Sequence, residues 1–237
     1  MGMGAAVLRR TMTTEATDPA ERGSADAVPL RGVGVWTRPL ALIAVALAAW
    51  GGRALLAGPR FGWMLWNLAL AVAPWLISSW LVARRRAAVT FAVGAAAWLL
   101  LLPNAPYLVT DLVHLHERPP VPLTVDVLFF TAFALAGVGL GLVSLLSMEE
   151  EVRRRLGPRA GLALVLAVLP LCGWGVFLGR VQRWNSWDVL VRPGALLSHS
   201  LEAARSGESL VFSAGFAALL AAAYLAVRPP VLRAPGS

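Results

Sequence analysis

The chain has little charge and almost no cysteine. Only 14% of its 237 residues are charged, whereas 58% are hydrophobic. So little charge is atypical of a water-soluble domain and typical of a membrane protein. The only cysteine, Cys172, excludes an intramolecular disulfide, and its apolar surroundings predict that it serves packing.

Lysine is absent as well, so all 21 basic residues are arginines. The net charge of +8 raises the possibility of nucleic acid binding. We exclude a nucleic acid partner, because the arginines flank apolar segments and do not form one basic face. The bias towards arginine and alanine is typical of a GC-rich bacterial genome.

Several catalytic motifs are missing too. The sequence contains no Gly-x-Ser-x-Gly, no His-Glu-x-x-His and no P-loop. These absences disfavour the common hydrolases and nucleotide-dependent enzymes, and they leave other enzymes open.

Six apolar stretches are long enough to cross a membrane, which takes about 20 helical residues. They lie at residues 39–57, 61–83, 87–103, 122–147, 160–178 and 209–227. The sequence therefore predicts an all-α, polytopic transmembrane domain over residues 39–228, in contact with the lipid bilayer. Residues 1–38 lack apolar periodicity and predict a disordered tail, and residues 229–237 form a short C-terminal tail.

The arginines also predict the orientation. If the N-terminus lies inside, the inner segments hold 14 arginines and the outer segments hold seven. The positive-inside rule then places both tails in the cytoplasm of a multi-pass protein of the bacterial plasma membrane. The segments after the third and fifth spans are two crossings apart, so both should lie at the outer boundary.

The first polar cluster is Pro103-Asn104-Ala105-Pro106-Tyr107, followed by Asp111 and His114. The prolines should break the helix, either as a re-entrant turn that lines a site or as a plain helix end with Tyr107 as an interfacial anchor. Asp111 and His114 share a face of a helix and suit a proton relay or a divalent metal. The alternative is a solvated loop.

The second polar cluster is Gly179-Arg180, then Arg183-Trp184-Asn185-Ser186-Trp187-Asp188. If the helix continued, Arg180, Trp184 and Asp188 would share one face. An arginine fork suits phosphate or carboxylate, whereas the alternative is an interfacial aromatic belt with Arg–Asp pairs. We expect the clusters to meet, with Asp111 or Asp126 within hydrogen-bond reach of Arg180 or Arg183.

Asp126 is the only acid inside a predicted span. It lies near the start of the fourth span, where a carboxylate can complement the helix dipole or contribute to a site. The candidate catalytic residues, which are also possible ligands of a divalent metal, are Asp111 and His114. The candidate substrate-binding residues are Asn104, Tyr107, Asp126, Arg180, Arg183, Trp184, Asn185, Trp187 and Asp188.

At these residues the chain resembles a family of bacterial integral membrane proteins known as domain of unknown function 1361. The resemblance rests on Leu102 to Tyr107 with Thr110-Asp111 and His114-Leu115, on Gly179-Arg180 with Arg183 to Asp188, and on the acid at Asp126. It covers roughly residues 60–228, and Gln182 stands where the family pattern suggests an apolar residue. The family has no established activity, so the resemblance implies a membrane location and a shared polar site.

Three classes of function fit this pattern. The first is a membrane enzyme or binder that handles an anionic or lipid-linked substrate, with Arg180 and Arg183 on the anion and Asp111 and His114 as acid and base. The second is a transporter or channel component, with Asp126 and the broken third span along a path. The third is a structural subunit in which the clusters join helices.

The predicted orientation can be tested with single cysteines at Glu117, Gly194 and Arg85 in a Cys172→Ala background. An impermeant thiol reagent should label the first two in spheroplasts, and it should label position 85 only after permeabilisation. Equal labelling of positions 85 and 117 would contradict the six-span arrangement.

Overall fold

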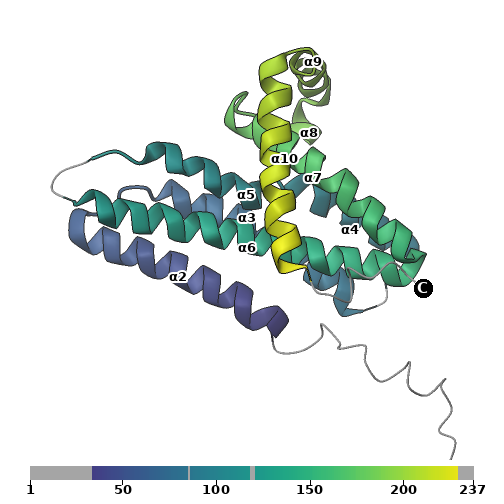
Figure 1. Cartoon of the computed structure of the whole chain (residues 1–237), viewed down its shortest axis with the longest axis horizontal. Coiled ribbons are helices and arrows are strands. Elements are labelled where there is room, and N and C mark those ends of the chain that lie inside the picture. The colour runs from purple at the N-terminus through teal and green to yellow at the C-terminus, as the bar shows by residue number, and fades with distance from the viewer. Residues whose placement is uncertain (1–33, 85, 118–120, 229–237) are drawn as a thin grey trace, which may run out of the picture.

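The computed structural model describes residues 34–84, 86–117 and 121–228, which are mostly helical (Figure 1). Six stretches are long and apolar enough to cross a membrane: Thr37–Ala57, Trp63–Ala83, Ala88–His114, Leu123–Leu156, Pro158–Arg180 and Gly207–Val227. The prediction of an all-α membrane protein with six spans is confirmed. The orientation stays a prediction.

The first helix, α2 (Gly34–Ala57), begins before the predicted start of the first span. Most of the predicted N-terminal tail, and all of residues 229–237, lie outside the described residues. Helix α3 (Trp63–Ala83) follows α2 and keeps its predicted end.

The third span differs most from its prediction, because Pro103 bends it without ending it. Helix α4 (Ala88–Leu101) is followed by α5 (Asn104–Tyr107) and the 3-10 helix η1 (Leu108–His114). Proline is tolerated at a helix start because its missing N–H has no partner there. The Pro103 carbonyl still accepts a hydrogen bond from the Tyr107 N–H at 3.1 Å, so the chain runs on in helical turns to His114.

The central helix α6 (Leu123–Leu156) is longer than its predicted span. Its last turns contain acids followed by arginines at helical spacing. Glu150 binds Arg153 at 2.7 Å and Glu151 binds Arg155 at 2.7 Å. Such pairs support a helix in water, which explains why the helix continues beyond its apolar stretch.

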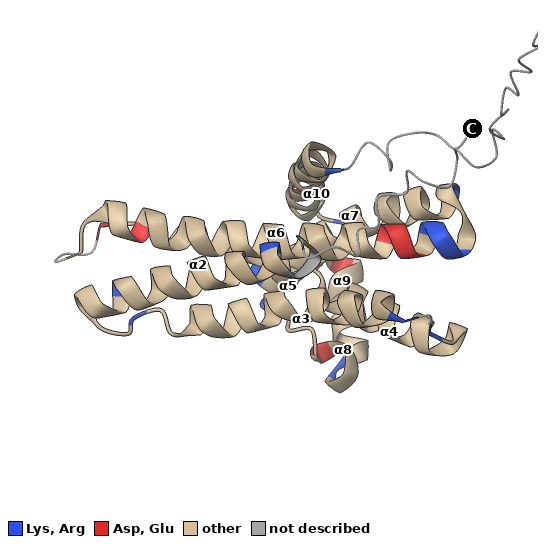
Figure 2. Cartoon of the chain, turned by 90° about the horizontal axis from the view of Figure 1, so that it is seen from below, with Lys and Arg blue, Asp and Glu red and all other residues tan. Residues whose placement is uncertain are grey.

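The remaining helices are α7 (Pro158–Arg180), the short α8 (Asp188–Val191), α9 (Pro193–Ala203) and α10 (Gly207–Val227). Helices α2, α3 and α6 run lengthwise beside one another, whereas α10 lies across the bundle against α7 (Figures 1 and 2). One apolar cluster surrounds Phe129, Phe130 and Phe133 of α6. A second surrounds Trp98, Leu145 and Met148.

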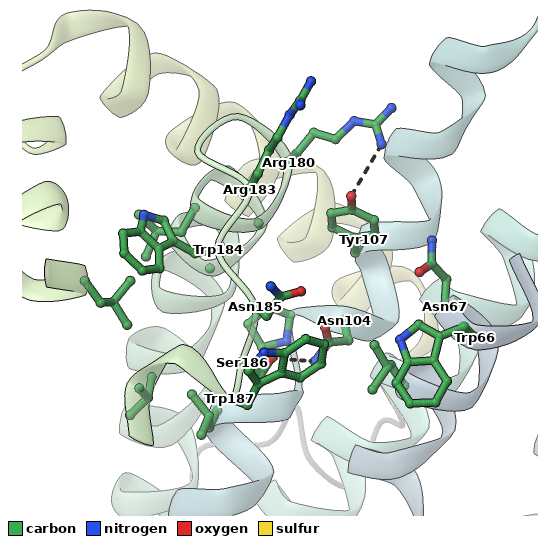
Figure 3. Close-up of a pocket in the computed structure, with 18 of the residues that line it drawn as sticks. Trp66, Asn67, Asn104, Tyr107, Arg180, Arg183, Trp184, Asn185, Ser186 and Trp187 are labelled. Atoms are coloured by element: carbon green, nitrogen blue, oxygen red, sulfur yellow. Dashed lines mark hydrogen bonds between the residues drawn. The ribbon is translucent and has the colours of Figure 1, made fainter. Parts of the chain in front are cut away.

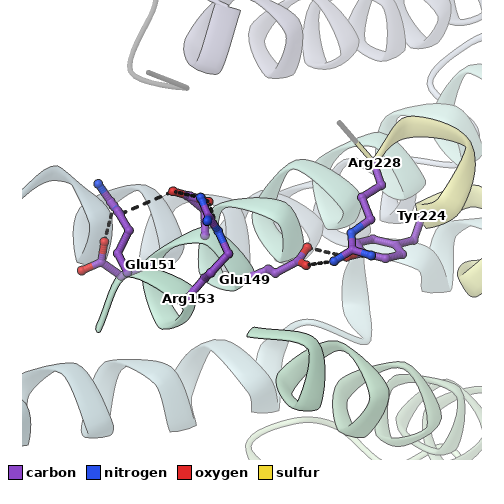
Figure 4. Close-up of polar contacts among 7 residues, drawn as sticks. Glu149, Glu151, Arg153, Tyr224 and Arg228 are labelled. Carbon is purple, nitrogen blue, oxygen red and sulfur yellow. Dashed lines mark hydrogen bonds and ion pairs between the residues drawn. The ribbon is translucent and has the colours of Figure 1, made fainter. Parts of the chain in front are cut away.

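Two ion pairs with buried carboxylates join α6 to neighbouring segments near its two ends. Near the start, Asp126 accepts a 2.7 Å bond from Nε of Arg53 on α2, and both side chains are buried. Towards the other end, buried Glu149 accepts bonds from the Tyr224 hydroxyl on α10 and from Arg228, the latter at 2.7 Å (Figure 4). The pairs tie α2 and the end of α10 to the same helix.

Glycine allows α5 to approach the middle of α6. A Cβ atom added at Gly137 would lie 2.2 Å from the Ala105 carbonyl oxygen and 3.0 Å from Cβ of Leu108. The backbone of α5 therefore rests directly on α6, and a larger residue would push the two apart.

We therefore expect Gly137→Ala to destabilise the protein by about 1–3 kcal/mol, the usual cost of overpacking. Gly51→Ala is the control, because nothing lies within 4 Å of the added Cβ on α2. It should leave stability unchanged or raise it, since alanine is the better helix former. Thermal unfolding in detergent measures both, and equal stability of the two variants would contradict the close contact.

Candidate functional site

The two polar clusters meet halfway along α6. The first cluster packs against Gly137 and Gly141, which are the 15th and 19th residues of the 34-residue helix. The second approaches from α7, where a Cβ at Gly175 would lie 2.5 Å from Pro103. The prediction that the clusters meet is confirmed. The first cluster was expected at the end of the third span and lies inside it, because α5 and η1 carry that span on past Pro103. The second cluster begins at Arg180, which is the last residue of the fifth span, as expected.

The contact between the clusters is an ion pair. Nη1 of Arg180 donates to Oδ1 of Asp111 at 3.1 Å, and Nδ2 of Asn67 donates to Oδ2 at 3.2 Å. The Asp111 side chain is completely buried, whereas that of Arg180 is 22% exposed. A buried carboxylate is tolerated only with partners, and here α3 and α7 supply one each.

Arg180 also lies close to two other polar side chains of the first cluster. Its Nη1 lies 3.4 Å from the Tyr107 hydroxyl, and its Nη2 lies 3.4 Å from Nε2 of His114 (Figure 3). The His114 ring packs edge-on against Trp63 of α3. Asp111 and His114 thus do share a face, as their spacing predicts, and the guanidinium group of Arg180 covers both.

Helix α7 ends at Arg180, so the predicted helical face of Arg180, Trp184 and Asp188 does not form. The chain reverses at Arg183, whose φ of 59° lies in the left-handed region. The Trp184 N–H bonds back to the Leu178 carbonyl at 3.0 Å and closes the turn. This conformation is uncommon for a residue other than glycine, and such strain concentrates at functional sites.

The segment after the turn is held by Asp188. Its carboxylate accepts the Asn185 N–H at 2.8 Å and Nη2 of Arg192 at 2.8 Å. The Asn185 N–H, followed by Arg192, lowers the pKa of the Asp188 carboxyl group below its usual value. This contribution to folding is present above the unfolded-state pKa and is lost as the pH falls through the lowered one.

A second link joins the clusters directly. Nδ2 of Asn104 donates to Oγ of Ser186 at 3.0 Å and to the Leu101 carbonyl at 2.9 Å. One amide thus satisfies a carbonyl near the bend after α4 and holds the loop after α7 in place.

A pocket of about 560 Å³ lies between the clusters (Figure 3). Its walls come from α3, α4, α5, α7 and the segment from Arg183 to Leu196. The described residues of the lining include no Asp or Glu. They include Arg183, which makes no hydrogen bond or ion pair within the described part of the chain. The pocket therefore carries an unneutralised positive charge.

Most of the predicted site residues line this pocket: Asn104, Tyr107, His114, Arg180, Arg183, Trp184, Asn185 and Trp187. Asp111 and Asp188 are not part of the lining and act on it through Arg180 and Asn185. Asp126 lies elsewhere, in its pair with Arg53. The acid–base role of Asp111 and His114 stays a prediction.

A divalent metal fits the described residues poorly. Among them, no three His, Cys, Asp or Glu side chains lie close enough together to hold an ion. Arg180 and Asn67 already occupy the carboxylate of Asp111, the strongest candidate ligand.

Sequence reasoning missed several residues that line the site, among them Trp66 and Asn67 of α3. Asn67 is the only amide in a long apolar stretch, and that isolation was the available signal, since a polar group inside a span needs a partner. Trp66 is one of ten tryptophans and carries no comparable signal.

The family model described as "Protein of unknown function (DUF1361)" matches residues 66–222, well over half of the chain. The chain belongs to this family. The match contains both polar clusters and the pocket, and it leaves out α2 with Arg53. No curated protein and no solved structure matches the chain.

The ion pair between Arg180 and Asp111 predicts a loss of stability when Arg180 is removed. Arg180→Ala leaves the carboxylate of Asp111 buried with Asn67 alone, which costs about 3–5 kcal/mol in soluble proteins. We expect a clear loss of thermal stability in detergent, and partial recovery when Asp111→Asn is added.

Arg192→Ala provides the matched control. It also removes an arginine from a carboxylate, but the Arg192 side chain is 60% exposed, and exposed pairs contribute about 0–1 kcal/mol. If Arg180→Ala cost no more than Arg192→Ala, Asp111 would not depend on Arg180.

Proposed function

We propose that this protein binds an anionic group, such as a phosphate, in the pocket between the two polar clusters. The proposal rests on Arg183, which lines the pocket and makes no hydrogen bond or ion pair among the described residues. Asp111 neutralises Arg180 and Asp188 neutralises Arg192, so Arg183 is left as the charge available to a ligand. A guanidinium fork binds phosphate and carboxylate oxygens through two parallel hydrogen bonds.

The surrounding groups support an oxyanion ligand. Asn185 and Tyr107 line the same pocket and can donate to oxygen. The left-handed turn at Arg183 is closed by the Trp184 N–H and followed by the bonds to Asp188, so it presents the arginine from a fixed loop. A prepared site of this kind loses less entropy when it binds.

A purely structural role explains the site less well. Helix contacts in membranes are usually made by small residues, as Gly137 and Gly175 do here. The Arg180–Asp111 pair can be explained as a link between helices. Arg183, which has no partner among the described residues, contributes nothing to helix packing.

Transport is the second candidate, because a broken span beside a polar pocket is typical of transporters. Outside the pocket lining, however, buried Trp98 donates to Ser144 at 2.6 Å, and Ser144 donates to the Pro74 carbonyl at 3.0 Å. Trp98 belongs to a tightly packed apolar cluster. Among the described residues these polar groups are therefore occupied by one another, which favours binding over passage.

The test uses two probes that share a phosphate head group: glycerol 3-phosphate, and phosphatidic acid in detergent micelles. At least one should bind the purified protein saturably. Arg183→Gln should weaken that binding by about 10- to 100-fold, since a hydrogen bond to a charged group contributes about 1.5–3 kcal/mol. Arg183→Lys should fall in between, because lysine keeps the charge and loses the fork.

Arg205→Gln is the control, since Arg205 is exposed between α9 and α10 and does not line the pocket. It removes the same charge from the protein and should leave affinity unchanged. Binding that is equally weakened by both variants, or by neither, would show that the pocket is not the anion site.

A further inference from the structure

The lining of the pocket combines charged groups with large apolar side chains. Figure 3 shows Arg180 and Arg183 beyond Tyr107 at one end of the view, and Trp66 and Trp187 at the opposite end. Besides the two tryptophans, the lining contains apolar side chains from α3, α4, α7, α8 and α9: Leu70, Leu100, Leu178, Val189 and Leu196. A ligand that fills this pocket must therefore be amphipathic.

Part of the apolar lining belongs to helices that suit a bilayer. Trp66 and Leu70 lie on one face of α3 at i and i+4, and Leu100 lies on α4. Both helices are parts of candidate membrane spans. This wall is therefore in a position to face the hydrocarbon of the lipid.

Two tryptophans of the lining are also partly exposed. Trp66 and Trp187 line the pocket, and yet 59% and 46% of their surfaces remain exposed. They come from different parts of the fold, α3 and the segment before α8. A chain that passed between these two indoles would leave the pocket between α3 and α8.

We propose that the ligand is a lipid phosphate whose head group meets Arg183 and whose hydrocarbon chain leaves between Trp66 and Trp187. This inference rests on the proposed anion binding and adds the class of ligand. A soluble phosphate would use only the arginines of the pocket, whereas a lipid phosphate would also place its acyl chain against Trp66, Leu70 and Leu100.

The experiment compares Trp66→Ala with Leu76→Ala. Leu76 is a matched control because it lies on α3, is 48% exposed and does not line the pocket. Both changes remove exposed apolar surface, so neither opens a cavity in the core. Affinity is measured by native mass spectrometry or equilibrium titration of the full chain, with phosphatidic acid at one fixed micelle composition and, separately, with glycerol 3-phosphate.

We expect Trp66→Ala to weaken the binding of phosphatidic acid by about tenfold, the effect of losing one indole contact with a chain, and to leave glycerol 3-phosphate unaffected. Leu76→Ala should change neither. Because every variant is measured at the same micelle composition, partitioning of the lipid into micelles cancels.

Two results would overturn the lipid assignment and leave anion binding intact. One is that glycerol 3-phosphate binds wild-type protein as tightly as phosphatidic acid does. The other is that Trp66→Ala and Leu76→Ala bind phosphatidic acid equally well, while Arg183→Gln still weakens it. Failure of the Arg183 variants themselves would instead reject the proposed function.

Discussion

The ion pair between Arg180 and Asp111 is the contact on which the site depends. A completely buried carboxylate in an apolar bundle is stabilised by a cation, and here the last turn of α7 supplies one against η1. Once that turn is fixed, the chain after it has to reverse, and it does so at Arg183. The pocket is the space left between the reversed segment and the bent third span. The pair thus positions the groups around the pocket, and its own carboxylate does not line the pocket.

The arginines near the site divide into three kinds. Arg180 is bound to Asp111 and holds helices together, and Arg192 is bound to Asp188 and holds the loop. Arg183 has neither task in the described structure. Residues of one type within a dozen positions thus have different roles, and the difference comes from which carboxylate each one reaches, not from the arginine itself.

The sequence was sufficient for the spans, because a helix must satisfy its own backbone in lipid and the apolar runs are therefore long and distinct. It also predicted that Asp111 or Asp126 would meet Arg180 or Arg183, and the structure selects Asp111 and Arg180 from these four pairings. The sequence did not reveal how far along the spans the two clusters contact each other. The bend at Pro103 looks the same in sequence whether the helix stops or continues in tighter turns, and only the contact of Ala105 with Gly137 decides the matter. Asp126 was misleading for a related reason: its partner, Arg53, lies on a helix whose register against α6 no local pattern reveals.

Three long-range ion pairs with buried carboxylates or guanidinium groups, in the part of the chain that the structure describes, have a consequence for how the chain is made. Each joins residues far apart in sequence: Arg53 with Asp126, Asp111 with Arg180, and Glu149 with Arg228, at separations of 73, 69 and 79 residues. During synthesis the earlier residue of every pair is therefore made one or more spans before its partner exists. For a charge inside a span, such as Asp111, isolation costs about 2.5–3.5 kcal/mol at the centre of a membrane helix on insertion scales. No pair can contribute to stability before the later helix arrives. Because Glu149 pairs with Arg228, which follows the last span, this link between α6 and the end of α10 forms only after the last span has been translated.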